Sequence, residues 1–160
     1  MDAEDVLVIV EIPKGSRNNY ELDKVTGRVM LDRTLFTSMA YPADYGFIDG
    51  TLGEDGDPLD ALVLVADPTF PGCRIRVRLI GVFHMSDEKG PDEKLLCVPL
   101  GDPSFERIRD IHDVNSELRD EIEHFFQRYK DLEPTKRTET RGFGNRSEAD
   151  AILVQARERA

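Results

Sequence analysis

The chain has 160 residues, of which 39% are hydrophobic and 33% charged, and this composition fits a single globular domain over residues 1–160 with its own core. The formal net charge of −11 disfavours a nucleic-acid-binding protein, which needs a basic face, and favours the binding of cations. No apolar run reaches the roughly 18 residues of a membrane-spanning helix, and the acidic N-terminus MDAEDVLVIV lacks the bases of a signal peptide. With Cys73 and Cys97 interpreted as reduced core thiols, these features predict a cytoplasmic protein.

The first two thirds of the chain predict short β-strands that are separated by glycine and proline. Residues 19–23 and 28–32 predict a hairpin that turns through Thr26 and Gly27. Residues 74–85 begin with alternating arginine and apolar residues, which is typical of a strand with one buried face. The expected strands are 6–12, 19–23, 28–32, 61–66, 74–85 and 95–100.

The last third of the chain predicts two α-helices. An apolar stripe with helical spacing runs over residues 118–132 and is stopped by Pro134. Residues 147–150 are interpreted as a capping box that opens a second helix, with Leu153 on its apolar face. Many short strands followed by two helices predict a mainly β protein, a β-barrel with flanking helices, and not a sheet of alternating βαβ units.

A run of acids precedes the strand expected at 61–66. Residues 34–73 contain seven acids and neither lysine nor arginine, so Asp55, Asp57 and Asp60 have no basic neighbour in the sequence to neutralise them. Gly56 permits a tight turn on which the three carboxylates can converge, and Mg²⁺ or Ca²⁺ prefers such oxygen ligands. The spacing does not fit an EF-hand, and a solvated loop closed by side-chain turns remains the alternative.

A second acidic cluster, Asp87, Glu88, Asp92 and Glu93, follows the strand expected at 74–85. Two carboxylate clusters at strand ends can supply ligands for several divalent ions. Divalent ions together with basic residues favour an anionic, metal-bound substrate, such as a phosphate ester or anhydride. The basic and phenolic candidates are Arg33, Tyr41, Tyr45, Lys94, Tyr129 and Lys130.

Several motifs occur in one order from about residue 6 to residue 143. They are Glu11-Ile-Pro, Tyr20-Glu21, Asp32-Arg33, AYPADYGFI, DGDPLDALV, DEKGPDEKL and HFFQRYKDLEP. This series resembles the family I soluble inorganic pyrophosphatases of the short bacterial type. The resemblance implies a five-stranded, OB-like closed β-barrel with helices packed outside. It also implies hydrolysis of pyrophosphate to two phosphates with Mg²⁺, about three to four ions per active site.

The resemblance further implies a role for each site residue. Asp57 would accept the proton of a water that bridges two metal ions, and Tyr45 would be the second catalytic residue. The implied metal ligands are Asp55, Asp60, Asp87, Asp92 and Glu21. The implied substrate-binding residues are Arg33, Tyr41, Lys94, Tyr129, Lys130 and Asn19. Glu11 and Glu88 would support the site.

The residues alone leave other roles open for three of these. Tyr129 lies on the apolar helical stripe and fits a core residue, Lys130 fits a solvated helix end, and Arg33 fits a surface salt bridge. A non-catalytic acidic module that binds a cation or a partner on the same fold is the alternative function. A calcium-binding module is a third hypothesis.

Two stretches depart from the family pattern. Asn19 stands where the family normally has a phosphate-binding lysine, and Lys14 or Arg17 on the same loop can restore the missing charge only by turning inward. Phe143 stands where tryptophan is common, and Glu139 where lysine is common. These departures concern substrate affinity more than the type of reaction.

The resemblance also implies an assembly. Short bacterial relatives form hexamers, and a histidine in the helix that here carries His124 and Phe125 commonly lies at the subunit contact. We therefore predict a homohexamer. The alternative is that Phe125 and Phe126 only fill the core.

Overall fold

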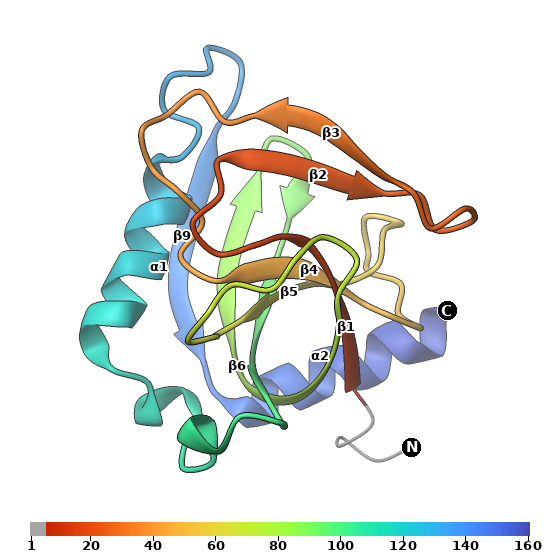
Figure 1. The fold of residues 1–160 in the computed structure, drawn as a ribbon. Helices are drawn as coiled ribbons and strands as arrows, with labels where there is room; N and C mark the ends of the chain where they lie inside the picture. The colour runs from red at the N-terminus through yellow and green to blue at the C-terminus, as the bar shows by residue number, and fades with distance from the viewer. Residues whose placement is uncertain (1–5) are drawn as a thin grey trace.

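Five strands form a closed ring in the computed structural model, which describes residues 6–160 (Figure 1). In spatial order, the ring contains β1 (Val6–Ile12), β4 (Asp44–Ile48), β5 (Asp60–Val63), β8 (Lys94–Pro99) and β6 (Arg74–Asp87). The start of β6 returns to pair with β1 and closes the ring. Neighbouring strands are antiparallel except β5 and β8, which are parallel. The expected mainly β fold with a closed five-strand barrel is therefore confirmed.

β6 is long enough to pair with several neighbouring strands. Its far half pairs with β9 (Thr138–Gly144) and with the two-residue β7 (Gly90–Pro91). The register against β8 shifts between Leu79 and Gly81, and a Cβ atom at Gly81 would lie 2.8 Å from the carbonyl oxygen of Gly144. The bend of β6 toward β9 therefore requires a glycine at this position.

Successive side chains along each strand point to opposite faces of the sheet, so they pack into two separate core clusters. On β8, Leu96 joins the cluster that contains Phe125 and Phe126, while Leu95 and Cys97 join the cluster that contains Leu153. Each cluster is covered by one helix, so the barrel presents a buried surface to both helices.

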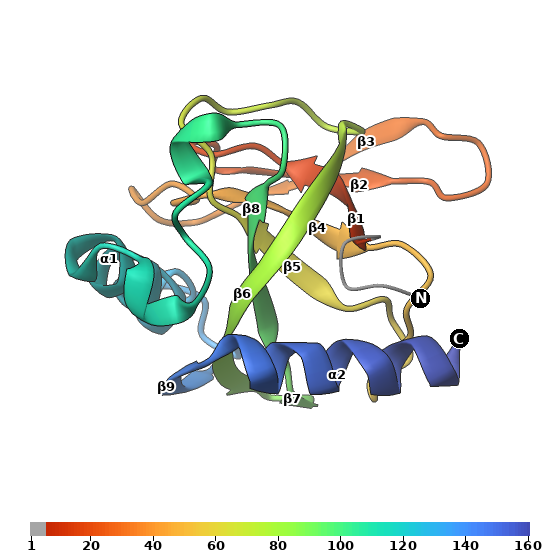
Figure 2. The ribbon, with the colours of Figure 1, turned by 90° about the horizontal axis from the view of Figure 1, so that it is seen from below.

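The two helices are α1 (Ser116–Arg128) and α2 (Arg146–Arg159), and both are capped by asparagine. Figure 2 shows α2 lying across the barrel beside β6. The expected capping box at residues 147–150 is wrong, because Asn145 Oδ1 accepts the hydrogen bond from the Glu148 amide and the helix begins two positions earlier. The stripe expected to reach Leu132 also ends sooner: α1 stops at Arg128, and Leu132 is 59% exposed.

The expected hairpin is confirmed as β2 (Asn18–Leu22) and β3 (Val29–Thr34), which form a separate two-stranded sheet that extends from the ring (Figure 1). Gly27 turns the chain with a φ of 74°, and the Asp23 carboxylate accepts from the amides of Val25 and Thr26. The Glu11 side chain accepts from the Leu22 amide at 3.0 Å, which ties the hairpin to β1.

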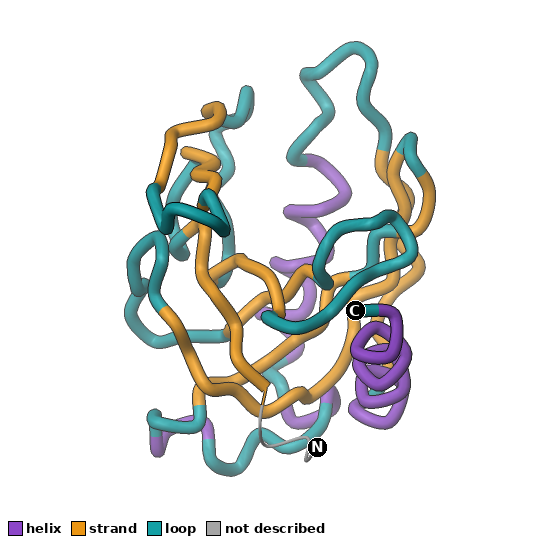
Figure 3. Tube along the Cα trace, turned by 90° about the vertical axis from the view of Figure 1, so that its right-hand side faces the viewer, coloured by secondary structure: helices purple, strands orange, loops and turns teal. Residues whose placement is uncertain are grey.

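Figure 2 shows the hairpin on one side of the molecule and β7 and β9, which pair with the far half of β6, on the opposite side. Figure 3 shows the helices, strands and loops from the right-hand side of Figure 1. Two single-turn helices, η2 (Pro103–Phe105) and η3 (Ile111–Asp113), connect β8 to α1. Cys97 is buried, Cys73 is partly buried, and both are free thiols as expected. None of the helices in residues 6–160 has the length and apolar character needed to span a membrane.

Candidate active site

A cleft of about 530 Å³ opens between the β2–β3 hairpin and the loops that lead into β5 and β8. Twelve of the fifteen predicted site residues line it, and they come from six parts of the chain. The lining residues with a predicted role are Glu11, Asn19, Glu21, Arg33, Tyr41, Tyr45, Asp57, Asp60, Asp92, Lys94, Tyr129 and Lys130. The structure therefore brings together acidic, basic and phenolic groups that are up to 119 positions apart in the sequence, from Glu11 to Lys130.

The buried ammonium group of Lys94 lies at the centre of the cleft. Its Nζ donates to Asp60 Oδ2 at 2.7 Å, to Asp92 Oδ2 at 2.9 Å and to the Tyr45 hydroxyl at 2.8 Å. The parallel register of β5 and β8 pairs Asp60 directly with Lys94, so the backbone sets this contact. Burial disfavours the charged amine, but Asp60, Tyr45 and Asp92 outweigh it and hold the pKa of Lys94 well above its usual range.

Asp60, the first residue of β5, is thus neutralised by a lysine that lies on the neighbouring strand, which the sequence neighbourhood did not reveal. Burial raises the pKa of Asp92, and the Lys94 ammonium opposes that shift. Within residues 6–160, no group of three or more His, Cys, Asp or Glu side chains is already close enough to hold a metal ion. The metal ligands therefore stay a prediction.

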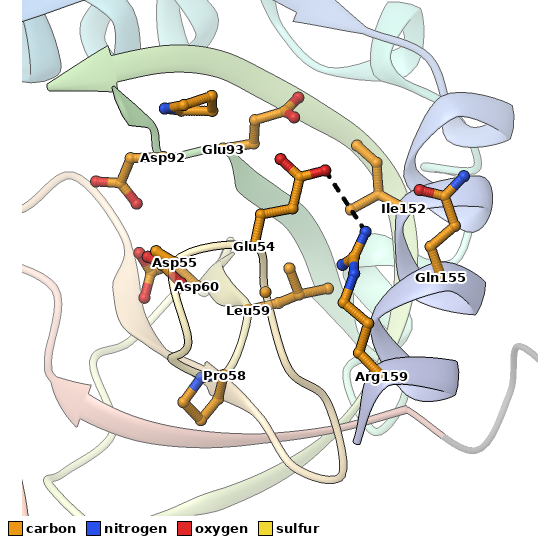
Figure 4. A pocket seen from close by; sticks show the side chains of 12 residues that line it. Glu54, Asp55, Pro58, Leu59, Asp60, Asp92, Glu93, Ile152, Gln155 and Arg159 are labelled. Carbon is orange, nitrogen blue, oxygen red and sulfur yellow. Dashed lines mark ion pairs between the residues drawn. The ribbon is translucent and has the colours of Figure 1, made fainter. Parts of the chain in front are cut away.

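The carboxylates nevertheless have the chemistry that Mg²⁺ requires. Figure 4 shows Asp55 and Asp60 beside each other, with Asp92 across from them, at a smaller cavity of about 80 Å³. Asp60 and Asp92 border both this cavity and the main cleft, whereas Asp55 borders only the smaller one and Asp57 only the main one. All the donors are carboxylate oxygens, which are the ligands that hard divalent cations prefer.

A side-chain turn shapes the loop that carries these acids. Asp55 Oδ1 accepts from the Asp57 amide at 3.0 Å, and the Gly53 amide donates to the Asp57 carbonyl oxygen at 2.7 Å. Gly56 has a φ of 88°, in the region that favours glycine. The closed turn considered in the sequence analysis is present, and it directs Asp55 and Asp57 into different cavities.

Three tyrosines form a phenolic wall. Burial raises the pKa of Tyr41 to about 12, and burial also raises the pKa values of Tyr45 and Tyr129. The Tyr41 ring contacts the Tyr45 ring with centroids 5.3 Å apart, and Tyr129 packs on Phe125 at 5.0 Å. All three phenols therefore stay neutral near pH 7, and each can donate a hydrogen bond to an anion. Tyr129 is thus both a core residue and a lining residue.

Arg33 and Lys130 present basic groups at the cleft. The Arg33 guanidinium donates to both carboxylate oxygens of Glu133, at 2.6 and 3.4 Å, which fixes its orientation. Burial lowers the pKa of Lys130, whose Nζ lies 5.2 Å from the Tyr129 ring centroid. The salt bridge considered for Arg33 is therefore present, at a residue that also lines the cleft.

Asn19 and Glu11 lie at the hairpin side of the cleft. The Oδ1 atom of Asn19 is buried and accepts no hydrogen bond from any residue in the described part of the chain. Burial raises the pKa of Glu11, although the Leu22 amide and the Lys24 charge oppose that shift. The proposed substitutes for the missing lysine lie elsewhere: Lys14 Nζ donates to the Val65 carbonyl oxygen and Arg17 to that of Thr37.

Three predicted residues do not line the main cleft. Asp55 is described above; Asp87 and Glu88 border a separate cavity of about 280 Å³, together with Glu139. The β6–β7 pairing explains the split, because Asp87 pairs with Gly90 and turns the chain before it reaches Asp92. Hydrogen bonds from backbone amides, including that of Arg137, lower the pKa of Glu88 to about 2.

The cleft also contains residues without a predicted role. The most informative are Lys24, in the hairpin turn, and Lys89, in the β6–β7 turn. Neither belongs to a periodic pattern, and each lies in a turn whose position depends on tertiary pairing. A lysine adjacent to a recognised acidic motif was the only available signal, and Lys89 in DEKGPDEKL fits it. Phe143 is absent from the cleft lining and packs on Phe83, with ring centroids 4.9 Å apart.

Comparisons with known proteins agree with this geometry. The sequence model of the inorganic pyrophosphatase family matches residues 8–160. An inorganic pyrophosphatase of Streptomyces coelicolor is 60% identical over 152 residues, which are 95% of this chain and 93% of that protein. The solved inorganic pyrophosphatase of Helicobacter pylori superposes with a TM-score of 0.96 at 45% identity, covering 99% of this chain and 94% of that chain. That of Thermus thermophilus gives a TM-score of 0.95 at 42% identity, covering 99% and 93%.

Proposed function

This chain belongs to the inorganic pyrophosphatase family, and from this premise we propose that it hydrolyses inorganic pyrophosphate to two phosphates in a Mg²⁺-dependent reaction. One observation carries the proposal: a single cleft joins carboxylates, among them those of Asp57, Asp60 and Asp92, to basic and phenolic groups that suit phosphate oxygens. A cleft of one charge type would fit either the metal or the anion, but not both.

The acidic residues would hold the metal. Asp55, Asp60 and Asp92 are the proposed principal ligands, and Asp87 and Glu21 are proposed to contribute to further ions. Mg²⁺, when bound, offsets the negative charge of the substrate and makes water more acidic. Every proposed ligand is a carboxylate, which fits Mg²⁺ and disfavours softer metals.

Asp57 is the proposed general base. Its side chain is exposed, lies at the main cleft and forms no ion pair with a described residue, so its carboxylate is free to accept a proton. The attacking water forms a bond to one phosphorus and gives its proton to Asp57, while the bridging P–O bond breaks and the second phosphate leaves. General-base assistance of this kind contributes about 10²- to 10⁴-fold to a rate.

The basic and phenolic groups would bind and orient the phosphates. Arg33, Lys94 and Lys130 are proposed to contact phosphate oxygens through charge-assisted hydrogen bonds, with Arg33 already held by Glu133. The neutral hydroxyl of Tyr45 donates to the charge that develops on the substrate, a role that needs the proton to stay on the phenol. Glu11 supports the cleft by holding the hairpin.

A phosphate-release assay tests the proposal. Purified protein with pyrophosphate should release phosphate when Mg²⁺ is present and lose this activity when a chelator removes the metal. Calorimetric titration with Mg²⁺, run in parallel, separates the alternatives. Binding of Mg²⁺ without any release of phosphate would contradict the proposal and favour the non-catalytic cation-binding module.

A further inference from the structure

Five cationic side chains line the main cleft, and two of them are paired with acids of the chain. Arg33 is paired with Glu133, and Lys94 with Asp60 and Asp92. The unpaired cations of the cleft are therefore Lys24, Lys89 and Lys130. A di-anionic or more highly charged substrate must find its counter-charges among such groups in addition to the metal.

The hairpin side of the cleft supplies little unpaired charge, because its Arg33 is paired with Glu133. Asn19 is uncharged, and the cations nearest to it in sequence, Lys14 and Arg17, donate to backbone carbonyl oxygens away from the cleft. Lys24 does line the cleft, but its Nζ lies 4.7 Å from the Phe47 ring centroid in a cation–π contact. The ammonium group of Lys24 on this side is therefore free of an acid but is held against an aromatic ring.

The opposite side of the cleft carries the ammonium group of Lys89. Lys89 lies in the turn between β6 and β7, and Figure 2 shows β7 across the molecule from the hairpin. Its ammonium group forms no hydrogen bond or ion pair with any residue from 6 to 160, although the residue lines the cleft. A lysine that lies over a cleft without a partner is available to an anion.

The turn that carries Lys89 is held in place. The Asp87 carboxylate accepts from the Lys89 amide at 2.8 Å, and the Glu88 carboxylate pairs with Lys136 at 3.4 Å. Gly90 completes the turn with a φ of 120°. These contacts fix the backbone and leave only the Lys89 side chain to move, which lowers the entropic cost of binding.

We propose that Lys89 binds the phosphate group of the substrate that lies nearest the mouth of the cleft. Its ammonium group donates charge-assisted hydrogen bonds to the phosphate oxygens and supplies a positive charge that the uncharged Asn19 does not. The inference rests on the proposed function, because pyrophosphate is the ligand that places a phosphate at this position. Lys89 acts in binding, and it takes no part in proton transfer.

The test compares Lys89→Gln with Lys89→Arg and with Arg107→Gln. Arg107 is an exposed cation that does not line the cleft, so its variant controls for the loss of one charge from the molecule. Lys89→Gln should raise the KM for pyrophosphate about tenfold, leave kcat within about twofold, and weaken calorimetric binding of inorganic phosphate by a similar factor. Lys89→Arg should restore both values. The difference from the parent protein should shrink in high salt, because exposed charges are screened.

One result would overturn the proposal: a Lys89→Gln variant with unchanged KM and unchanged affinity for phosphate. A tenfold loss of affinity in Lys24→Gln alongside that result would assign the binding cation to the hairpin. Absence of phosphate release by the parent protein would contradict the proposed function alone, because the calorimetric titration with inorganic phosphate still reads the contribution of Lys89.

Discussion

The Lys94 side chain must both be stable in its buried position and supply a positive charge to the cleft. Moving an ammonium group out of water costs several kcal/mol, and only close partners offset that cost. Its three N–H donors have three acceptors, on Asp60, Asp92 and Tyr45, so the group is fully hydrogen-bonded before any ligand arrives. The charge at the centre of the cleft is therefore fixed in advance, and a phosphate oxygen that accepts a hydrogen bond from Lys94 must replace one of these three acceptors.

The role of Asp57 leads to the first prediction. Asp57→Asn keeps the shape of the side chain and removes its basicity, so kcat for pyrophosphate should fall by about 10²- to 10⁴-fold. Affinity for Mg²⁺, measured by calorimetry, should fall less than in Asp60→Asn. Asp67→Asn, which changes an exposed acid outside the cleft, is the matched control. Equal turnover in Asp57→Asn and the parent would remove Asp57 from the role of base.

The second prediction concerns position 19. The buried Oδ1 atom of Asn19 has no donor within the described chain, and a lysine here would bring a charge to the hairpin side of the cleft. Asn19→Lys should lower the KM for pyrophosphate several-fold, because a charge-assisted hydrogen bond exceeds a neutral one by about 1 kcal/mol. Steady-state kinetics measure the change. An unchanged KM would show that this side chain does not reach the substrate.

The third prediction concerns the phenols. Tyr41 has a pKa of about 12, against 10.0 for an ordinary tyrosine, and Tyr45 and Tyr129 also have raised values. Because the folded-state pKa values are raised, their contribution to stability is complete below pH 10 and is lost as pH rises through the folded values. An absorbance titration should show Tyr41, Tyr45 and Tyr129 ionising at higher pH in the folded than in the unfolded protein. Ionisation of these three phenols near pH 10 in the folded protein would contradict this.

At the scale of elements, α2 supports the acidic loop. The Leu52 amide donates to the Ala156 carbonyl oxygen at 2.9 Å, and Arg159 contacts Leu52 and Glu54 at 3.3 and 3.6 Å (Figure 4). The loop with Asp55 and Asp57 is thus attached to the last turn of a helix that also packs on β6. A helix far along the chain thereby fixes one end of the proposed metal site.

The fourth prediction tests where α2 begins. Asn145→Ala removes the side chain that caps the helix and should lower the free energy of unfolding by about 1 kcal/mol, with a fall in Tm of about 2–4 °C. Ser147→Ala, at the position where the sequence predicted the cap, should leave Tm nearly unchanged. Thermal unfolding followed by circular dichroism measures both. A larger effect from Ser147→Ala would restore the sequence-based boundary.

The predicted elements were those whose own residues specify them. Strands β1, β5, β6 and β8 and the hairpin have the apolar or turn patterns that predict them, whereas β9 is the polar stretch TETRGFG. Its strand conformation depends on pairing with the far half of β6. β4 contains Gly46, a weak strand former, because a Cβ atom there would lie 2.0 Å from the Ile9 carbonyl oxygen. Close packing between strands dictated that residue, and a local pattern cannot reveal such packing.

The candidate site also has features that local sequence predicts and features that depend on how the strands pair. The family motifs placed most lining residues, but the pairing of Lys94 with Asp60 depends on strand register across 34 positions. The split between Asp92 and the pair Asp87 and Glu88 depends on the β6–β7 turn, and the free ammonium of Lys89 depends on the same turn. The sequence therefore predicted which types of residue form the site better than it predicted which of them pair with one another and which cavity each side chain borders.

At the scale of the whole molecule, the fifth prediction is the homohexamer. Phe125 and Phe126 are buried in the core, so they cannot form a subunit contact, while His124 is exposed on α1. Exposed apolar side chains elsewhere, at Met30, Phe36 and Phe70, add surface that favours self-association. Light scattering should give six times the 18.1 kDa mass of the chain. A monomer mass at micromolar concentration would contradict the assembly.

The parallel pairing of β5 and β8 has a consequence for how the chain finds its fold. Because β6 lies between these strands in sequence, β5 and β8 pair across a long connection, and non-local pairing of this kind is slow to form. A slip of one residue would turn Lys94 toward the apolar face now occupied by Leu95 and bury its charge without a carboxylate. Lys94 thus links strand register to function. Only a chain in which β5 and β8 pair in the correct register both folds stably and presents the charge of Lys94 to a substrate.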